Sequence, residues 1–163
     1  MRLPCPKRFG FTLIEMLVAV TIGGVLLAGG IAAYRGTGKR IIVRQAGEKL
    51  ATELRAVQKK ALSGEKPSVC SEEGEDLISY QVNYKDSYSY TIQADCETET
   101  EEPIKIISLP SGVEFETINF NIQFPALGGA VSGAQTITIK HEDGNYLYGV
   151  IVAAGGVISG GFQ

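Results

Sequence analysis

Residues 7–18 read KRFGFTLIEMLV: two cations, a glycine, and then an apolar run that contains one carboxylate, Glu15. Residues 16–34 carry no charge. As a helix with a rise of about 1.5 Å per residue they would span roughly 28 Å, close to the ~30 Å hydrocarbon core of a bilayer. We therefore expect a transmembrane helix at residues 11–34. A charge inside such a segment costs about 2.5–3.5 kcal/mol, so Glu15 is expected to have a partner.

A partner for Glu15 arises if the chain is cut between Gly10 and Phe11. The new N-terminus is then an ammonium group four residues from the carboxylate. In a bundle of parallel helices, the amine of one chain can face Glu15 of its neighbour, and both charges are neutralised only at one axial register. We expect Glu15 to specify assembly.

The run from Lys7 to Gly10 followed by Phe-Thr-Leu-Ile-Glu at residues 11–15 resembles the class III signal of type IV prepilins and type II secretion pseudopilins. The resemblance implies that residues 1–10 are a leader peptide, cleaved after Gly10. It implies that a prepilin peptidase on the cytoplasmic face also methylates the amine of Phe11. The N-terminus of the precursor would then stay in the cytoplasm.

The same resemblance implies partners and a location. Other pilins or pseudopilins would bind through the N-terminal helix, and an assembly ATPase and an inner-membrane platform protein would extract the subunit. The protein would cross the inner membrane once, with its head in the periplasm or outside, before it enters an extracytoplasmic filament.

A second helical pattern follows the uncharged run. Residues 34–66 hold nine Lys and Arg against three Asp and Glu, and their apolar positions recur at steps of three and four, which predicts an amphipathic helix at residues 35–66. The predicted buried stripe is Val43, Ala46, Leu50, Leu54, Val57 and Ala61, and the opposite face carries Arg44, Lys49, Arg55, Lys59 and Lys60. No proline lies between Pro6 and Pro67, so one helix from about Phe11 to Leu62 is possible, ending at Ser63-Gly64.

Beyond Pro67 the apolar period changes to two, which predicts strands. The expected strands are residues 78–84, 88–94, 104–109, 113–124 (bent or bulged), 135–140 and 146–153, with turns at residues 85–87 and 142–145. The glycines at 128, 129, 155, 156, 160 and 161 are expected to interrupt strands. The predicted fold class is α+β: a long N-terminal helix packed on an antiparallel β-sheet head, residues 67–163.

Two of the three cysteines, Cys70 and Cys96, follow the expected membrane segment and so share a compartment. If it is oxidising, a disulfide would close a loop of about 27 residues and stabilise the fold by about 3–4 kcal/mol. Two unrelated buried thiols are the alternative. Cys5 has no apolar stretch before it, which argues against a lipoprotein cysteine.

The head is similar to a narrower group. The helix pattern, the disulfide-sized loop, residues 124–128 and the final strand before residues 155–158 resemble the H-type minor pseudopilins and FimT-like minor pilins. That group often has an arginine where this chain has Gly156. Major type IVa pilins typically carry a disulfide near the C-terminus and kink prolines in the first helix, so a minor subunit is favoured. Type II secretion, pilus and competence systems share this N-terminus, and the machine stays open.

Other function classes have less support in the sequence. The alternatives within the class are a major pilin and a competence pseudopilin for DNA uptake. Residues 67–163 hold three Lys against fourteen Asp and Glu, which argues against a nucleic-acid partner for the head; a DNA site would have to use the basic residues 39–60. From another class, a signal-anchored exported binding protein or enzyme could be cut after Ala32, but Glu15 would then stay unpaired.

No catalytic or cofactor site is expected. His141 is the only histidine, beside the turn at 142–145, and is interpreted as a surface strand residue. No catalytic set, phosphate loop or metal-ligand spacing is present. Calcium at the acidic runs 72–76 and 97–102 stays an open alternative, although neither run has the alternating Asp/Asn pattern with a turn glycine.

Overall fold

The computed structural model describes residues 10–70, 76–97 and 103–162, apart from the side chains of residues 28–36 and 69. The chain divides into two compact units, Met1–Gly38 and Lys39–Gln163. The leader up to residue 9, with Cys5, and most of both acidic runs lie outside the described residues. The interpretations placed on them remain expectations.

One helix, α1 (Leu13–Ser63), runs through both units. It begins two residues later than expected and continues through the glycines at 23–24, 29–30 and 36–38, so the prediction of a single helix is confirmed. In the described part of the chain, no helix is both long and apolar enough to cross a bilayer.

The end of α1 follows the predicted stop at Ser63-Gly64. The Gly64 N–H donates to the Ala61 carbonyl (3.0 Å), and the Glu65 N–H donates to the Lys60 carbonyl (3.1 Å). Gly64 has a φ of 64°. This pair of bonds, closed by a residue in the left-handed region, is a Schellman motif, which satisfies carbonyls that the helix leaves unpaired. A salt bridge between Lys60 and Glu65 (2.9 Å) accompanies it.

The second half of α1 packs on the sheets through the stripe that the sequence predicts. All six predicted stripe residues are buried, and the five cations assigned to the opposite face are exposed. Gly47 and Ala51 are also buried but were not predicted. They widen the stripe on the side that faces strand β7 (Leu147–Val152), where Tyr148 approaches Gly47.

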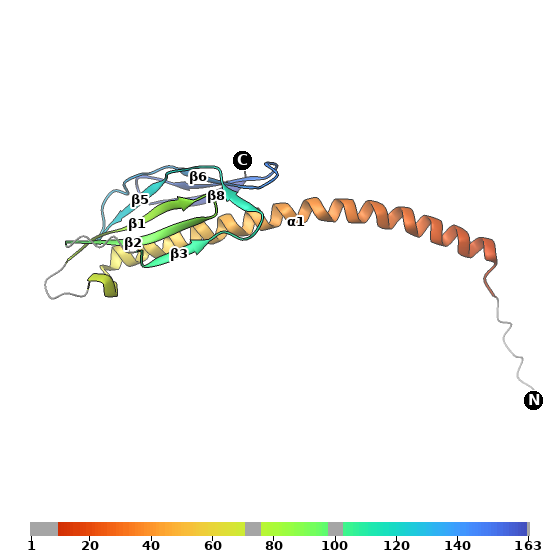
Figure 1. The fold of residues 1–163 in the computed structure, drawn as a ribbon, viewed down its shortest axis with the longest axis horizontal. Coiled ribbons are helices and arrows are strands. Elements are labelled where there is room, and N and C mark those ends of the chain that lie inside the picture. Colours follow the sequence, from red (N-terminus) through yellow and green to blue (C-terminus); the bar gives the residue numbers. More distant parts are fainter. Residues whose placement is uncertain (1–9, 71–75, 98–102, 163) are drawn as a thin grey trace, which may run out of the picture. The chain divides into compact units, whose positions relative to one another are not determined.

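The head contains two four-stranded antiparallel sheets (Figure 1). Sheet A has the order β3-β2-β1-β5 and sheet B the order β4-β6-β7-β8. The strands of sheet A are β1 (Leu77–Asp86), β2 (Ser89–Cys96), β3 (Lys105–Ser108) and β5 (Asn121–Pro125). Those of sheet B are β4 (Val113–Phe115), β6 (Thr136–His141), β7 and β8 (Ile158–Phe162), and a short 3-10 turn, η1 (Ser68–Cys70), precedes β1.

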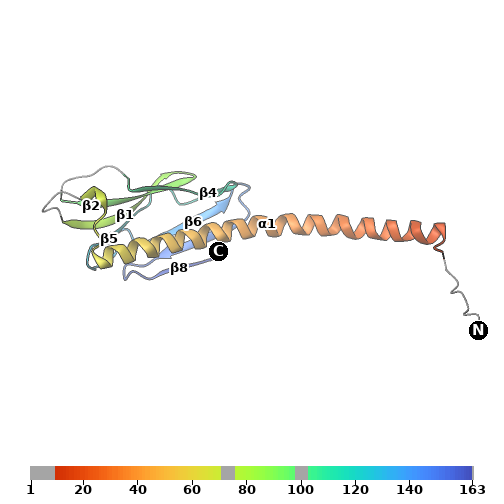
Figure 2. The same cartoon turned by 90° about the horizontal axis from the view of Figure 1, so that it is seen from below.

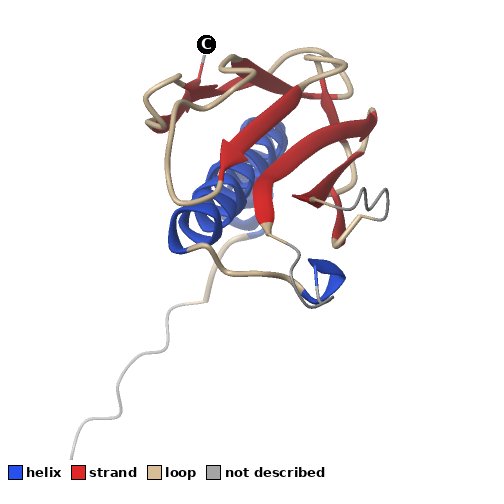
Figure 3. Cartoon of the chain, turned by 90° about the vertical axis from the view of Figure 1, so that its left-hand side faces the viewer, coloured by secondary structure: helices blue, strands red, loops and turns tan. Residues whose placement is uncertain are grey.

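The two sheets flank the helix and share one core. Figure 2 shows β8 beside the second half of α1, and Figure 3 shows the strands curving around two sides of it. Edge-to-face aromatic contacts join the sheets, with Phe115 of β4 lying 6.1 Å from both Tyr84 and Tyr90 of sheet A and 5.2 Å from Phe120. Such pairs contribute about 0.5–1.5 kcal/mol each beyond the area that they bury.

The prediction of one strand over residues 113–124 is wrong. This segment forms β4 in sheet B and β5 in sheet A, so it carries the chain from one sheet to the other. Asn119 has a φ of 57°, which breaks the extended backbone between the two strands. Thr117 Oγ1 also accepts the N–H of Thr138 (2.9 Å), which holds the bend against β6.

The prediction that Gly160 and Gly161 interrupt a strand is also wrong, because both lie inside β8. A Cβ on Gly160 would lie 2.8 Å from the Tyr148 hydroxyl oxygen and 2.9 Å from its ring. The glycine therefore makes room for the tyrosine ring of the neighbouring strand. The tight turn between β6 and β7 is as predicted, with Gly144 at a φ of 78°.

Candidate processing and assembly site

The start of α1 is fixed by Thr12. The Glu15 N–H donates to Thr12 Oγ1 (3.3 Å) and to the Thr12 carbonyl (3.1 Å), and the Met16 N–H donates to the same carbonyl (3.2 Å). Thr12 is thus the N-cap. Thr12-Leu-Ile-Glu15 has the spacing of a capping box, so the sequence carries a local signal for the start of this helix that was not predicted.

Gly10 and Phe11 precede the first turn of the helix and are exposed, Phe11 by 76% of its surface. A Cβ on Gly10 would meet nothing within 4 Å, and its φ is outside the left-handed region. Among the described residues, nothing in the fold requires a glycine at this position. The Gly10–Phe11 peptide bond is thus exposed and lies outside the helix.

Glu15 lies exposed in the first turn of α1. Among the described residues, no cation lies within ion-pairing distance of it. A carboxylate near a helix N-terminus gains about 0.3–1 kcal/mol from the helix dipole. Among the described residues, Glu15 thus has the helix N-terminus as a favourable neighbour but no cation as a partner.

The large apolar side chains of residues 11–27 are all exposed by 47% or more. The set is Phe11, Leu13, Ile14, Met16, Leu17, Val18, Val20, Ile22, Val25, Leu26 and Leu27. An exposed apolar surface of this extent marks a lipid or protein contact. Residues 11–27 thus present an apolar surface suited to a lipid or protein contact.

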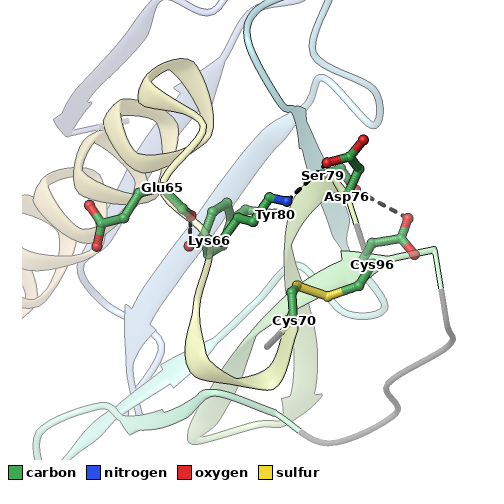
Figure 4. Close-up of a disulfide and its surroundings, with 8 residues drawn as sticks. Glu65, Lys66, Cys70, Asp76, Ser79, Tyr80 and Cys96 are labelled. Carbon is green, nitrogen blue, oxygen red and sulfur yellow. Dashed lines mark hydrogen bonds and ion pairs between the residues drawn. A yellow bond between two sulfur atoms is a disulfide. The ribbon is translucent and has the colours of Figure 1, made fainter. Parts of the chain in front are cut away.

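The disulfide predicted in the head is confirmed. Cys70 and Cys96 are joined, with their Cα atoms 5.8 Å apart, and both residues are buried (Figure 4). The bond fastens η1 to the end of β2. Nearby, the Tyr80 hydroxyl donates to the Glu65 carbonyl (2.7 Å), and burial raises the pKa of Tyr80.

The segment between α1 and β1 is held at further points. Lys66 pairs with Asp76 (2.9 Å) across the same region, as the dashed line in Figure 4 shows.

The predicted site residues fall in different units. Gly10, Phe11 and Glu15 lie at the helix start, and the cysteines lie in the head.

His141 ends β6 and is only partly exposed, so it is less of a surface residue than expected. Its Nδ1 accepts the Asp143 N–H (3.3 Å) and lies 3.0 Å from Asp143 Oδ1. Asp143 Oδ2 in turn accepts a hydrogen bond from Lys39 (2.7 Å), which lowers the pKa of Asp143 to about 2. This cluster fastens the turn after β6 to α1. No cluster of three or more His, Cys, Asp or Glu side chains arranged to hold a metal ion occurs among the described residues.

Five cations of the basic helix segment already contact other residues of the second unit. Lys39 pairs with Asp143, Arg44 with Glu48 and Lys60 with Glu65. In addition, the Arg55 guanidinium donates to the Ile158 carbonyl (2.8 Å), and Arg40 lies over the ring of Phe162, 4.6 Å from its centroid. A DNA phosphate would have to compete with these contacts.

Comparison with known proteins bears on the N-terminus alone. Residues 5–31 match the family model of the prokaryotic N-terminal methylation motif. The chain carries a class III prepilin signal. The motif supports a type IV pilin-like protein and implies processing by a prepilin peptidase and assembly with other pilins. No curated protein and no solved structure matches the chain.

Proposed function

We propose that this protein is a structural subunit, a minor pilin or pseudopilin, of a type IV pilus or a type II secretion pseudopilus. The observation that carries the proposal is the methylation motif at residues 5–31, whose glycine has no role in the described fold. The exposed apolar surface of residues 11–27 supports it, because that surface needs lipid before assembly and neighbouring helices afterwards.

Processing supplies the positively charged partner that Glu15 lacks. Cleavage between Gly10 and Phe11 makes an ammonium group, which is then methylated and remains cationic. The subunit waits in the inner membrane with this end at the cytoplasmic side and its head outside. In the filament, the amine of one subunit faces Glu15 of the next and cancels the cost of burying either charge.

A minor rather than a major subunit is supported by one feature of the head and one of the helix. The disulfide lies in the middle of the chain, at Cys70 and Cys96, and not near the C-terminus. The helix also lacks proline. Gly156 departs from the arginine of the H-type relatives. At its φ of 81°, with Gln58 Nε2 only 2.5 Å from a Cβ position, a larger residue would be strained.

The Glu15→Leu variant tests the assembly role. It removes the charge but keeps an apolar helix, so insertion and processing should proceed as in the wild type. Entry into filaments should fall by about tenfold or more, since the neighbouring amine is left buried and unpaired, a loss of at least about 1.4 kcal/mol. The measurement is the amount of variant in purified filaments relative to processed protein in the membrane.

A matched control is Thr21→Leu, an exposed position in the same segment that removes no charge. It should enter filaments normally. Normal incorporation of Glu15→Leu would contradict the assembly role.

A further inference from the structure

The two sheets have four edge strands: β3 and β5 in sheet A, and β4 and β8 in sheet B. On β8, the Ile158 carbonyl accepts a hydrogen bond from Arg55 (2.8 Å). On β5, Gln123 exchanges two backbone hydrogen bonds with Ser132 (3.0 and 3.1 Å). On β4, the Phe115 N–H donates to the Ser87 carbonyl (2.8 Å). Three of the four edges are therefore engaged by other parts of the head.

The edge of β3 is different. The Leu109 N–H donates to the Tyr88 carbonyl (2.8 Å), which sets the phase of the ladder between β2 and β3. Hydrogen-bonded pairs alternate along an antiparallel ladder. The backbone N–H and C=O groups of Lys105 and Ile107 therefore face β2, whereas those of Ile106 and Ser108 point outward. Within the described residues, nothing bonds these outward N–H and C=O groups.

Cavities lie between this edge and α1. One of about 150 Å³ is lined by residues that include Ala56, Lys60, Ile104 and Lys105. Another, of about 380 Å³, is lined by Ile42, Gln45, Lys49 and residues 108–111. The helix residues of both recur every three or four positions from 42 to 60, so they form one stripe about 27 Å long. In Figure 1, β3 lies alongside this part of α1.

We call the space between β3 and the stripe at residues 42–60 of α1 the seam. Its lysines differ in whether they have an anionic partner. Lys105 pairs with Glu53 (3.1 Å) and Lys60 with Glu65 (2.9 Å). In the described part of the chain, Lys49 has no anionic partner. Ile106, exposed by 51% of its surface, lies on the strand itself. The seam thus combines unpaired backbone groups, an apolar side chain and a free positive charge.

We propose that the free edge of β3 binds an extended, acidic segment of another polypeptide. The segment adds a fifth strand to sheet A, bonds the backbone groups of Ile106 and Ser108, and places a carboxylate at Lys49. Main-chain bonds supply affinity in this mode of recognition, and alternate side chains supply specificity. A helical partner would leave the outward groups unpaired, and one free lysine is too few for a nucleic-acid strand.

Amide hydrogen exchange on the full-length chain in detergent micelles tests this proposal. The probes are two synthetic peptides, acetyl-Ser-Val-Thr-Val-Asp-Val-Thr-amide and the same peptide with lysine in place of aspartate. The aspartate peptide should slow exchange at Ile106 and Ser108 by about tenfold or more, as expected for new backbone hydrogen bonds, and leave Ile107 unchanged. The lysine peptide should bind at least about fivefold more weakly.

Two variants sharpen the test. Ser108→Pro removes one outward N–H from an edge strand, where proline is tolerated, and should abolish protection at Ile106. Lys49→Gln should remove the difference between the two peptides. Unchanged exchange in β7 shows that each variant is folded. Absence of protection at Ile106 and Ser108 in the wild type, or equal binding of both peptides, overturns the proposal.

Discussion

At the scale of single residues, two glycines make space for one tyrosine. The Tyr148 ring lies against Gly47 of α1 and Gly160 of β8 and packs edge-to-face on Phe162, with centroids 5.3 Å apart. A Cβ on Gly47 would lie 2.1 Å from the Tyr148 ring. The helix therefore approaches sheet B closely because residue 47 has no side chain.

Replacing Gly47 with alanine should destabilise the head, although alanine favours helices by about 1 kcal/mol. The added methyl group would have to displace the Tyr148 ring, and overpacking of this kind costs about 1–3 kcal/mol. Chemical denaturation followed by circular dichroism measures the change. Gly38→Ala is the matched control, because a Cβ there meets nothing within 4 Å, and it should be neutral or stabilising. A Gly47→Ala protein as stable as the control would contradict this packing.

Asp143 makes the stability of the head depend on pH. Its pKa is lowered from 3.8 to about 2, chiefly by the hydrogen bond from Lys39. A carboxylate whose pKa is lower in the folded state stabilises the fold above its unfolded pKa, and that stabilisation is lost as the pH falls through the folded pKa. The difference in unfolding free energy between the wild type and Asp143→Asn should therefore shrink between pH 4 and pH 2. A difference that grows on acidification would contradict the assignment.

At the scale of elements, the disulfide fastens η1 to the end of β2 and follows directly after the Schellman motif of α1. The 26-residue separation of its cysteines closes a loop worth about 3–4 kcal/mol in the unfolded-state entropy model. Cys96→Ser should lower the unfolding free energy by about this amount in oxidising conditions. Cys70→Ser, which breaks the same bond, should lower it equally, and a reductant should bring the wild type to the level of both variants. A wild type no more stable than the two variants in oxidising conditions would show that the bond does not stabilise the head.

The sequence predicted elements well where one period dominated. The stripe from Val43 to Ala61 repeats at 3.6 and is buried throughout. In the hairpin of β1 and β2, alternate apolar residues such as Tyr80 and Val82 are buried, although Ile78 is exposed beside a register shift. Prediction failed where long-range packing decided the outcome. Gly160 lies within a strand because Tyr148 covers it, and the bend at Asn119 depends on contacts between Thr117 and β6. Neither contact leaves a local signal in the sequence.

At the scale of the whole molecule, charge is divided along the chain. Removal of the leader would take away three of the 15 Lys and Arg and leave 18 Asp and Glu, a net charge of −6. The cations concentrate in the second half of α1, where Lys39, Arg44 and Lys60 form ion pairs. The edge of β3 was not foreseen, since a free strand edge depends on sheet order, which periodicity does not specify.

Cleavage between Gly10 and Phe11 is the step that would turn this chain into a filament subunit. Mass spectrometry of the N-terminus of the protein isolated from membranes detects that cleavage. The expected result is a chain that begins at Phe11 and carries one methyl group on its amine, with Gly10→Val retained as uncut precursor. A chain that begins near Ala33, or one that retains residues 1–10, would contradict the account.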